Sequence, residues 1–166
     1  MVGGNLDDNN VEIYKKIVNL ARRENCSKIG VISAANKKPD YWGTYYVNLL
    51  KRSLHKLEFH DKDYILKRRY GATHSLWIPV TEDDAYSPYN STIIKSILNV
   101  TGIFFGGGEP GRLMKSLYRF DFGMKIATPA MNAIKTVWKR GALISGTSAG
   151  IEVFQDGVII EGDEKM

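Results

Sequence analysis

The sequence holds few of the residues that build cross-links, membrane spans or metal sites. Cys26 is the only cysteine in 166 residues, which excludes an intramolecular disulfide and any zinc site made of several cysteines. No run approaches the roughly 18 apolar residues of a membrane-spanning helix, so we expect no membrane segment. There are only 3 histidines, namely His55, His60 and His74, and all of them fall in the first half of the chain.

The charge balance is only mildly basic. The formal net charge is +5, and the lysines and arginines occur in pairs or threes, with no long basic run interleaved with aromatics. We therefore expect a solvated surface and no nucleic-acid partner. The alternative interpretation of the basic charge is that it attracts acidic substrates or partners.

Short apolar runs alternate with amphipathic stretches. This alternation predicts an α/β fold in which a mainly parallel central sheet is covered by helices on both faces, a three-layer sandwich. We expect one domain over residues 1–166. Strands are predicted at 28–33, 73–80, 101–105, 141–145 and 157–160, and helices at 11–23, 41–54, 87–98, 111–120, 129–139 and directly after Gly150.

The strongest chemical signal is Gly146-Thr147-Ser148-Ala149-Gly150, a G-x-S-x-G turn between a strand and a helix. This context is typical of a nucleophile elbow, in which small residues must flank the serine because the turn is tight. Ser148 is the candidate nucleophile, and the Ala149 N–H is a candidate oxyanion donor. A helix-capping serine in an ordinary tight turn is the alternative.

A second glycine turn, Phe105-Gly106-Gly107-Gly108-Glu109, also follows a predicted strand. Glycines allow a ligand to approach the backbone closely, so Gly107 and Gly108 are candidate oxyanion donors. The turn lacks the dinucleotide fingerprint and the Walker lysine. Both glycine turns lie at carboxyl ends of predicted parallel strands, where such sheets place their sites.

Four segments resemble, in order, successive motifs of the cyanophycinase and dipeptidase E family of serine peptidases: residues 1–10, 28–35, 102–108 and 146–150. The resemblance implies a class I glutamine amidotransferase-like fold, of flavodoxin-like type. It implies that Ser148 attacks aspartyl-containing peptides such as cyanophycin or Asp-dipeptides. It implies no metal and no organic cofactor.

The sequence departs from this family in two places. The family's catalytic histidine lies downstream of the serine, whereas all three histidines here lie upstream of Ser148. Glu109 and Pro110 stand where the bacterial enzymes carry Asp-Gln, although Glu109 keeps the charge and Arg112 keeps the family pattern. Glu109 and Arg112 are therefore candidate substrate-binding residues, with a surface salt bridge as the alternative for Arg112.

Of the short strand that usually precedes the first glycine pair in this family, only Val2 is present, and the family's domain continues past the point where this sequence ends. We therefore expect a domain that is incomplete at both ends, and three histidines that are not catalytic. The acid of a triad is left open among the carboxylates that follow the serine, which are Asp156, Glu161, Asp163 and Glu164.

Three functions stay open at this stage: a serine peptidase whose base is missing from the sequence, an inactive relative that binds a peptide or partner, and an esterase of another α/β class. The exposed sheet edge of an incomplete domain predicts poor solubility or a homodimer. Three glycosylation sequons, at Asn25, Asn90 and Asn99, hint at secretion without deciding between that and the cytoplasm.

Overall fold

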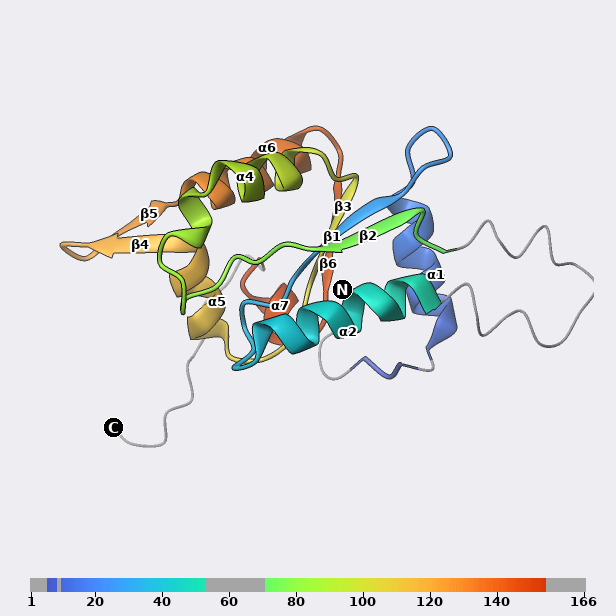
Figure 1. Ribbon diagram of the computed structural model, residues 1–166, viewed down its shortest axis with the longest axis horizontal. Coiled ribbons are helices and arrows are strands. Elements are labelled where there is room, and N and C mark those ends of the chain that lie inside the picture. The colour runs from blue at the N-terminus through green and yellow to red at the C-terminus, as the bar shows by residue number, and fades with distance from the viewer. Residues whose placement is uncertain (1–5, 9, 53–70, 155–166) are drawn as a thin grey trace, which may run out of the picture.

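A four-stranded parallel sheet forms the centre of the molecule (Figure 1). The computed structural model describes residues 6–8, 10–52 and 71–154. The strand order is β2-β1-β3-β6, the order of a flavodoxin-like sheet, so the predicted fold class is confirmed. The strands are β1 (Lys28–Ile32), β2 (His74–Trp77), β3 (Gly102–Phe105) and β6 (Leu143–Gly146).

Helices cover both faces of this sheet (Figure 1). Helices α1 and α2 pack on one face, and α4 and α6 pack on the other. Helices α5 and α7 follow β3 and β6 at the carboxyl edge of the sheet. The helices are α1 (Val11–Leu20), α2 (Pro39–Arg52), η2 (Ser87–Tyr89, a 3-10 turn), α4 (Ser91–Leu98), α5 (Pro110–Leu117), α6 (Pro129–Lys139) and α7 (Ala149–Glu152).

The molecule has two hydrophobic cores, one on each face of the sheet, and successive side chains of a strand point alternately into one and the other. On β1, Val31 packs toward α1 and α2, whereas its neighbour Ile32 packs toward α4 and α6. Phe104 and Phe105 on β3 divide in the same way. All four side chains are fully buried, as expected for strands that are covered on both faces.

One predicted helix is wrong in its second half. The helix predicted over 111–120 ends at Leu117, and the chain then forms an antiparallel hairpin of β4 (Tyr118–Asp121) and β5 (Met124–Ala127). Phe122 and Gly123 make its two-residue turn with φ of 46° and 75°. Positive φ at both positions is the type I′ turn, which matches the twist of a hairpin.

Three other predicted boundaries shift for local reasons. The first helix ends at Leu20 rather than Arg23, and the left-handed residues Glu24 and Asn25 then turn the chain into β1. The strand predicted over 73–80 ends at Trp77. The helix predicted over 87–98 divides at Asn90, because the Asn90 side chain accepts the N–H groups that open α4.

Some predicted features lie outside the described residues. These are most of the motif at residues 1–10, the aperiodic stretch from Lys56 to Tyr70, and the strand predicted at 157–160.

Candidate active site

Ser148 sits in a strained turn where β6 passes into α7. Its backbone has φ 50° and ψ −136°, a conformation close to the first corner of a type II′ turn, which glycine normally occupies. The Thr147 N–H donates to the Phe105 carbonyl at 3.1 Å and so ties this residue to β3. The Ser148 carbonyl in turn accepts the Ile151 N–H at 3.0 Å. The serine is therefore held by the backbone on both sides at the carboxyl edge of the sheet.

The two glycines of the G-x-S-x-G turn are required by close backbone packing. A Cβ at Gly146 would lie 2.7 Å from the Phe105 carbonyl oxygen. A Cβ at Gly150 would lie 2.5 Å from the Gly106 carbonyl oxygen. Real Cβ atoms do not approach oxygen so closely, so any side chain at either position would push β6 and α7 away from β3.

The second glycine turn passes directly beside the serine. A Cβ at Gly107 would lie 3.1 Å from the Ser148 Cβ. Gly108 has φ 145°, and the next residue, Glu109, donates its N–H to the Ala35 carbonyl at 2.7 Å. The structure thus brings together Ser148, Gly107, Gly108 and Ala149, as the two predicted turns require.

Two backbone donors are available next to the serine. Within the described residues, the N–H groups of Gly108 and Ala149 donate no hydrogen bond. The Ala149 N–H opens α7 and therefore has no partner within that helix. Unengaged N–H groups beside a nucleophile suit the negative oxygen that forms during acyl transfer.

Tyr46, from α2, closes one side of this arrangement, and sequence reasoning missed it. Its ring packs on Gly106, where a Cβ would lie 2.8 Å from Tyr46 Cε2, and on Phe104, with ring centroids 5.1 Å apart. Burial raises the pKa of the Tyr46 hydroxyl, while a hydrogen bond with the Gly107 backbone lowers it in part. A tyrosine in a helix without a motif carries no signal that could have predicted this contact.

Glu109 and Arg112 lie at the start of α5. Glu109 is exposed and is the N-cap residue, although its side chain makes no capping hydrogen bond. The Arg112 guanidinium contacts the Glu82 carboxylate at 2.7 Å and the Asp83 carboxylate at 2.8 Å. The predicted role of both residues in substrate binding stays a prediction, and Arg112 already holds two carboxylates of the chain.

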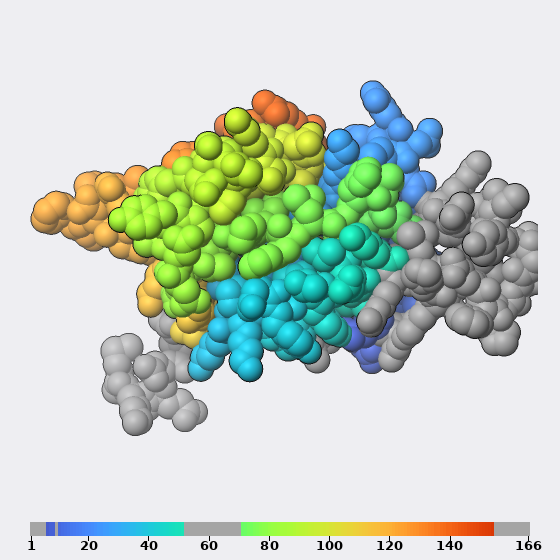
Figure 2. All heavy atoms as spheres, viewed as in Figure 1, coloured from blue at the N-terminus to red at the C-terminus, as the bar shows by residue number. Residues whose placement is uncertain are grey.

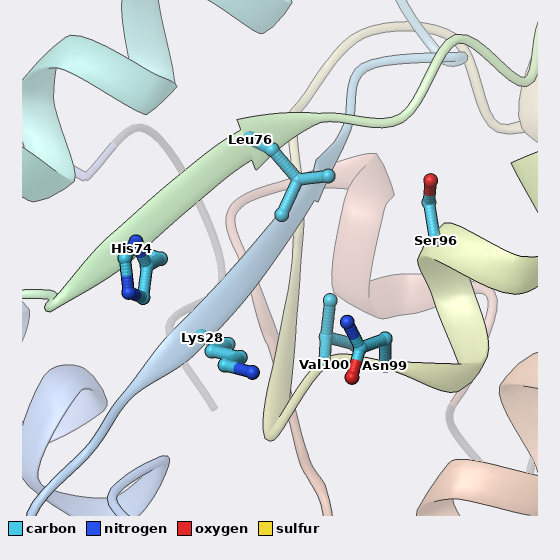
Figure 3. Close-up of a pocket in the computed structure, with 6 residues that line it drawn as sticks. All are labelled: Lys28, His74, Leu76, Ser96, Asn99 and Val100. Carbon is cyan, nitrogen blue, oxygen red and sulfur yellow. The ribbon is translucent and has the colours of Figure 1, made fainter.

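The one histidine among the described residues is at the wrong edge of the sheet for catalysis. His74 begins β2 and pairs in register with Lys28, whereas Ser148 follows the carboxyl end of β6. Four-residue strands at about 3.3 Å per residue separate the two edges. His74 instead lines a shallow cavity of about 300 Å³ with Lys28, Ser96 and Asn99 (Figure 3). His55, His60 and the four candidate triad acids lie outside the described residues.

Within residues 6–8, 10–52 and 71–154, no three side chains of His, Cys, Asp or Glu gather in a way that could hold a metal ion. Among the described helices, none is long and apolar enough to cross a membrane.

The fold is similar to that of a solved peptidase. The crystal structure of a peptidase from an acI-B1 Actinobacterium superimposes with a TM-score of 0.60 at 18% sequence identity. The match covers 90% of this chain but 53% of the other, so the chain spans about half the length of that protein.

The family model of peptidase family S51 matches residues 56–165. The matched residues include both glycine turns and Ser148, and they confirm the resemblance to the cyanophycinase and dipeptidase E family that the motifs indicated. The chain therefore belongs to peptidase family S51.

Proposed function

We propose that this protein is a serine-type peptidase that hydrolyses aspartyl-containing peptides, with Ser148 as its nucleophile. The observation that carries the proposal is the backbone conformation of Ser148, which has a φ of 50°. Gly146 and Gly150 enforce this conformation, because both pack closely against the backbone at the end of β3. Strain of this kind is maintained where the surrounding structure enforces it, and it concentrates at functional sites. A serine that merely capped a helix would need no such conformation, and its side chain makes no capping hydrogen bond here.

The chemistry would proceed by acyl transfer. A base takes the proton from Ser148 Oγ while Oγ bonds to the peptide carbonyl carbon. The unengaged N–H groups of Ala149 and Gly108 stabilise the resulting oxyanion. Collapse expels the amine, which receives the proton, and water then releases the acid from the acyl-enzyme. The aspartyl specificity rests on the family resemblance, with Glu109 and Arg112 as the proposed contacts.

The base is the part of this proposal that the described residues do not supply. His74 lies at the opposite edge of the sheet, so the proposed base is a histidine outside residues 6–8, 10–52 and 71–154. The same observation favours the alternative that this chain is an inactive relative that retains the site to bind a peptide.

Labelling with a fluorophosphonate probe tests the nucleophile directly. The purified 166-residue chain should be labelled, and Ser148→Ala should lose labelling completely. Ser145→Ala is a matched control, because Ser145 Oγ is committed to the Ile103 carbonyl at 3.1 Å, and it should label like the unmodified chain. Labelling that persists in Ser148→Ala would show that another residue is the nucleophile. A folded chain that takes up no probe would mean that no base in these 166 residues activates Ser148, as expected for the inactive relative or for a peptidase whose base is missing from this sequence.

The substrate class needs a separate measurement. Hydrolysis of an α-linked dipeptide with an amino-terminal aspartyl residue should be compared with that of the same dipeptide carrying asparagine. Hydrolysis of the β-linked Asp–Arg dipeptide should be compared with that of the dipeptide in which the free α-carboxyl of Asp is an amide (isoasparagine). We expect cleavage of the aspartyl peptides only. Equal cleavage of the asparagine and isoasparagine peptides would contradict the proposed specificity while leaving Ser148 in its role.

A further inference from the structure

The hairpin of β4 and β5 carries more exposed apolar surface than a solvated element needs. Phe122 at its tip is 97% exposed, and Phe120 and Met124 are exposed by 56% and 61%. Phe122 also adopts φ 46°, where an asparagine or glycine is the usual residue of a type I′ turn. In Figure 2 the hairpin, in orange, projects beyond the body of the molecule. A strained, fully exposed aromatic at a projecting tip points to a contact surface.

The register of the hairpin shows that β4 has an open hydrogen-bonding edge. Asp121 pairs with Met124 across the two-residue turn, and the Thr128 N–H donates to the Leu117 carbonyl at 3.0 Å. Bonded pairs alternate along an antiparallel ladder, so Phe120 directs its N–H and C=O away from β5. In the described part of the chain nothing outside the hairpin bonds to the Phe120 backbone.

We propose that β4 pairs antiparallel with β4 of a second copy of this chain, around a two-fold axis at Phe120. Each Phe120 would then exchange both backbone hydrogen bonds with the Phe120 of the second copy. The two exposed rings would face each other as a cross-strand aromatic pair.

The charges of β4 are complementary under this symmetry. Centring the pair on Phe120 places Arg119 opposite Asp121 of the second copy, and Asp121 opposite its Arg119. Within one chain Arg119 and Asp121 already form an ion pair of 3.3 Å on the same face, with side-chain exposures of 60% and 43%. The dimer would therefore gather four charges in a two-by-two cluster, in which each charge faces one of opposite sign across the strands, an arrangement that favours pairing.

The proposed pairing of the two β4 strands also places a side chain of the second copy at the cavity beside β4. Tyr118 would lie opposite Phe122 of the second copy. Tyr118 lines a cavity of about 660 Å³ together with Pro88, Tyr89 and Phe120. The protruding Phe122 of each copy would enter this partly aromatic cavity of the other, so one contact buries the most exposed ring of both chains.

The other edge of the hairpin is unsuited to the same role. On β5, Lys125 is the counterpart of Phe120, because the two residues pair across the hairpin. Its N–H and C=O therefore point away from β4. A two-fold pairing centred there would set Lys125 opposite Lys125 of the second copy, and like charges directly opposite each other destabilise a ladder.

A charge-swap experiment tests the pairing. Arg119→Asp makes both charged positions of β4 negative, and Asp121→Arg makes both positive. Sedimentation equilibrium should show a dimer for the unmodified chain and a monomer for each variant alone. An equimolar mixture of the two variants should again form dimers, because opposite charges then face each other. A contact within one chain could not be restored by mixing.

Two further variants complete the test. Phe122→Ser should weaken dimerisation at least about tenfold, the loss of a buried aromatic contact. Lys139→Asp on α6, an exposed change of the same charge, should leave the dimer intact. Thermal melts of every variant show whether the monomer still folds. A monomeric unmodified chain, dimeric single variants, or a folded mixture that stays monomeric would each overturn the proposal.

Discussion

At the scale of single residues, the backbone of Ser148 carries the most information. Its φ of 50° and ψ of −136° suit glycine, yet the residue is serine, and a Cβ in this region costs on the order of 1–3 kcal/mol. The strained conformation persists because Gly146 and Gly150 allow β6 and α7 to pack closely against the Phe105 and Gly106 carbonyls. Under the proposed function, the turn trades stability for the direction of the Ser148 hydroxyl.

This trade predicts that two substitutions at Ser148 differ in stability. Ser148→Ala removes the hydroxyl but keeps the Cβ, so the strain remains. Ser148→Gly removes both the hydroxyl and the Cβ, so the strain is relieved. We expect the free energy of unfolding of Ser148→Gly to be about 0.5–1 kcal/mol higher than that of Ser148→Ala, a difference that already includes the greater entropy of glycine in the unfolded chain. Urea denaturation of the two variants measures the difference. Alanine equal to or more stable than glycine would show that the turn is not strained, and this result does not depend on activity.

The residue scale also shows what sequence reasoning can reach. Ser148, Gly107 and Gly108 were predictable because their turns need small residues at fixed spacing, and the structure places Gly107 beside Ser148. Tyr46 was not predictable, because it reaches Gly106 from a helix some 60 residues earlier through packing alone. The roles of Glu109 and Arg112 stay predictions.

At the scale of elements, the start of α4 depends on one side chain. Asn90 Oδ1 accepts the N–H of Thr92 at 2.8 Å and that of Ile93 at 3.4 Å. Asn90→Ala leaves both donors to water and should lower the free energy of unfolding by about 1 kcal/mol. Asn90→Asp keeps an acceptor and should restore stability, which thermal or urea denaturation can check. If Asn90→Asp were as unstable as Asn90→Ala, the cap would not be the cause.

The hairpin shows why periodicity alone misplaced an element. Leu113, Leu117 and Phe120 fall at the i, i+4 and i+7 positions of a helix, so the pattern continues smoothly past the true end of α5. Leu113 and Leu117 are buried, whereas Phe120 is exposed on β4. The alternation that follows ends in a Phe-Gly turn, and bulky phenylalanine is a weak hairpin signal compared with Asn-Gly.

At the scale of the whole molecule, the sheet was the most predictable feature. Four short apolar runs that alternate with helices leave few topologies, and right-handed crossovers give the observed order. The same topology separates His74 from Ser148, since one begins its strand and the other follows its strand's end. The sequence therefore predicts which edge of the sheet bears the two glycine turns, because both turns follow the carboxyl ends of parallel strands.

One buried and two half-buried tyrosines are expected to make the stability of the molecule sensitive to alkali. Burial is the main cause that raises the pKa of the Tyr14, Tyr46 and Tyr118 hydroxyls above the usual 10.0, and the Asp8 charge adds to it for Tyr14. Each hydroxyl binds its proton more tightly in the folded state than in the unfolded state. The stability is therefore fully present below pH 10 and is lost as the pH rises through the folded pKa values.

Tyr14 offers a clean test of this dependence, because its hydroxyl is buried and has no hydrogen-bond partner among the described residues. Tyr14→Phe should change the free energy of unfolding little at about pH 8, or raise it by up to about 1 kcal/mol. Above pH 10 the variant should lose stability less steeply than the unmodified chain in urea denaturation. Tyr86→Phe is the control, because Tyr86 is 84% exposed, and it should follow the unmodified chain at every pH. Lysines titrate in the same range but are common to all three proteins. Parallel curves for Tyr14→Phe and the unmodified chain would mean that Tyr14 ionises equally well in both states.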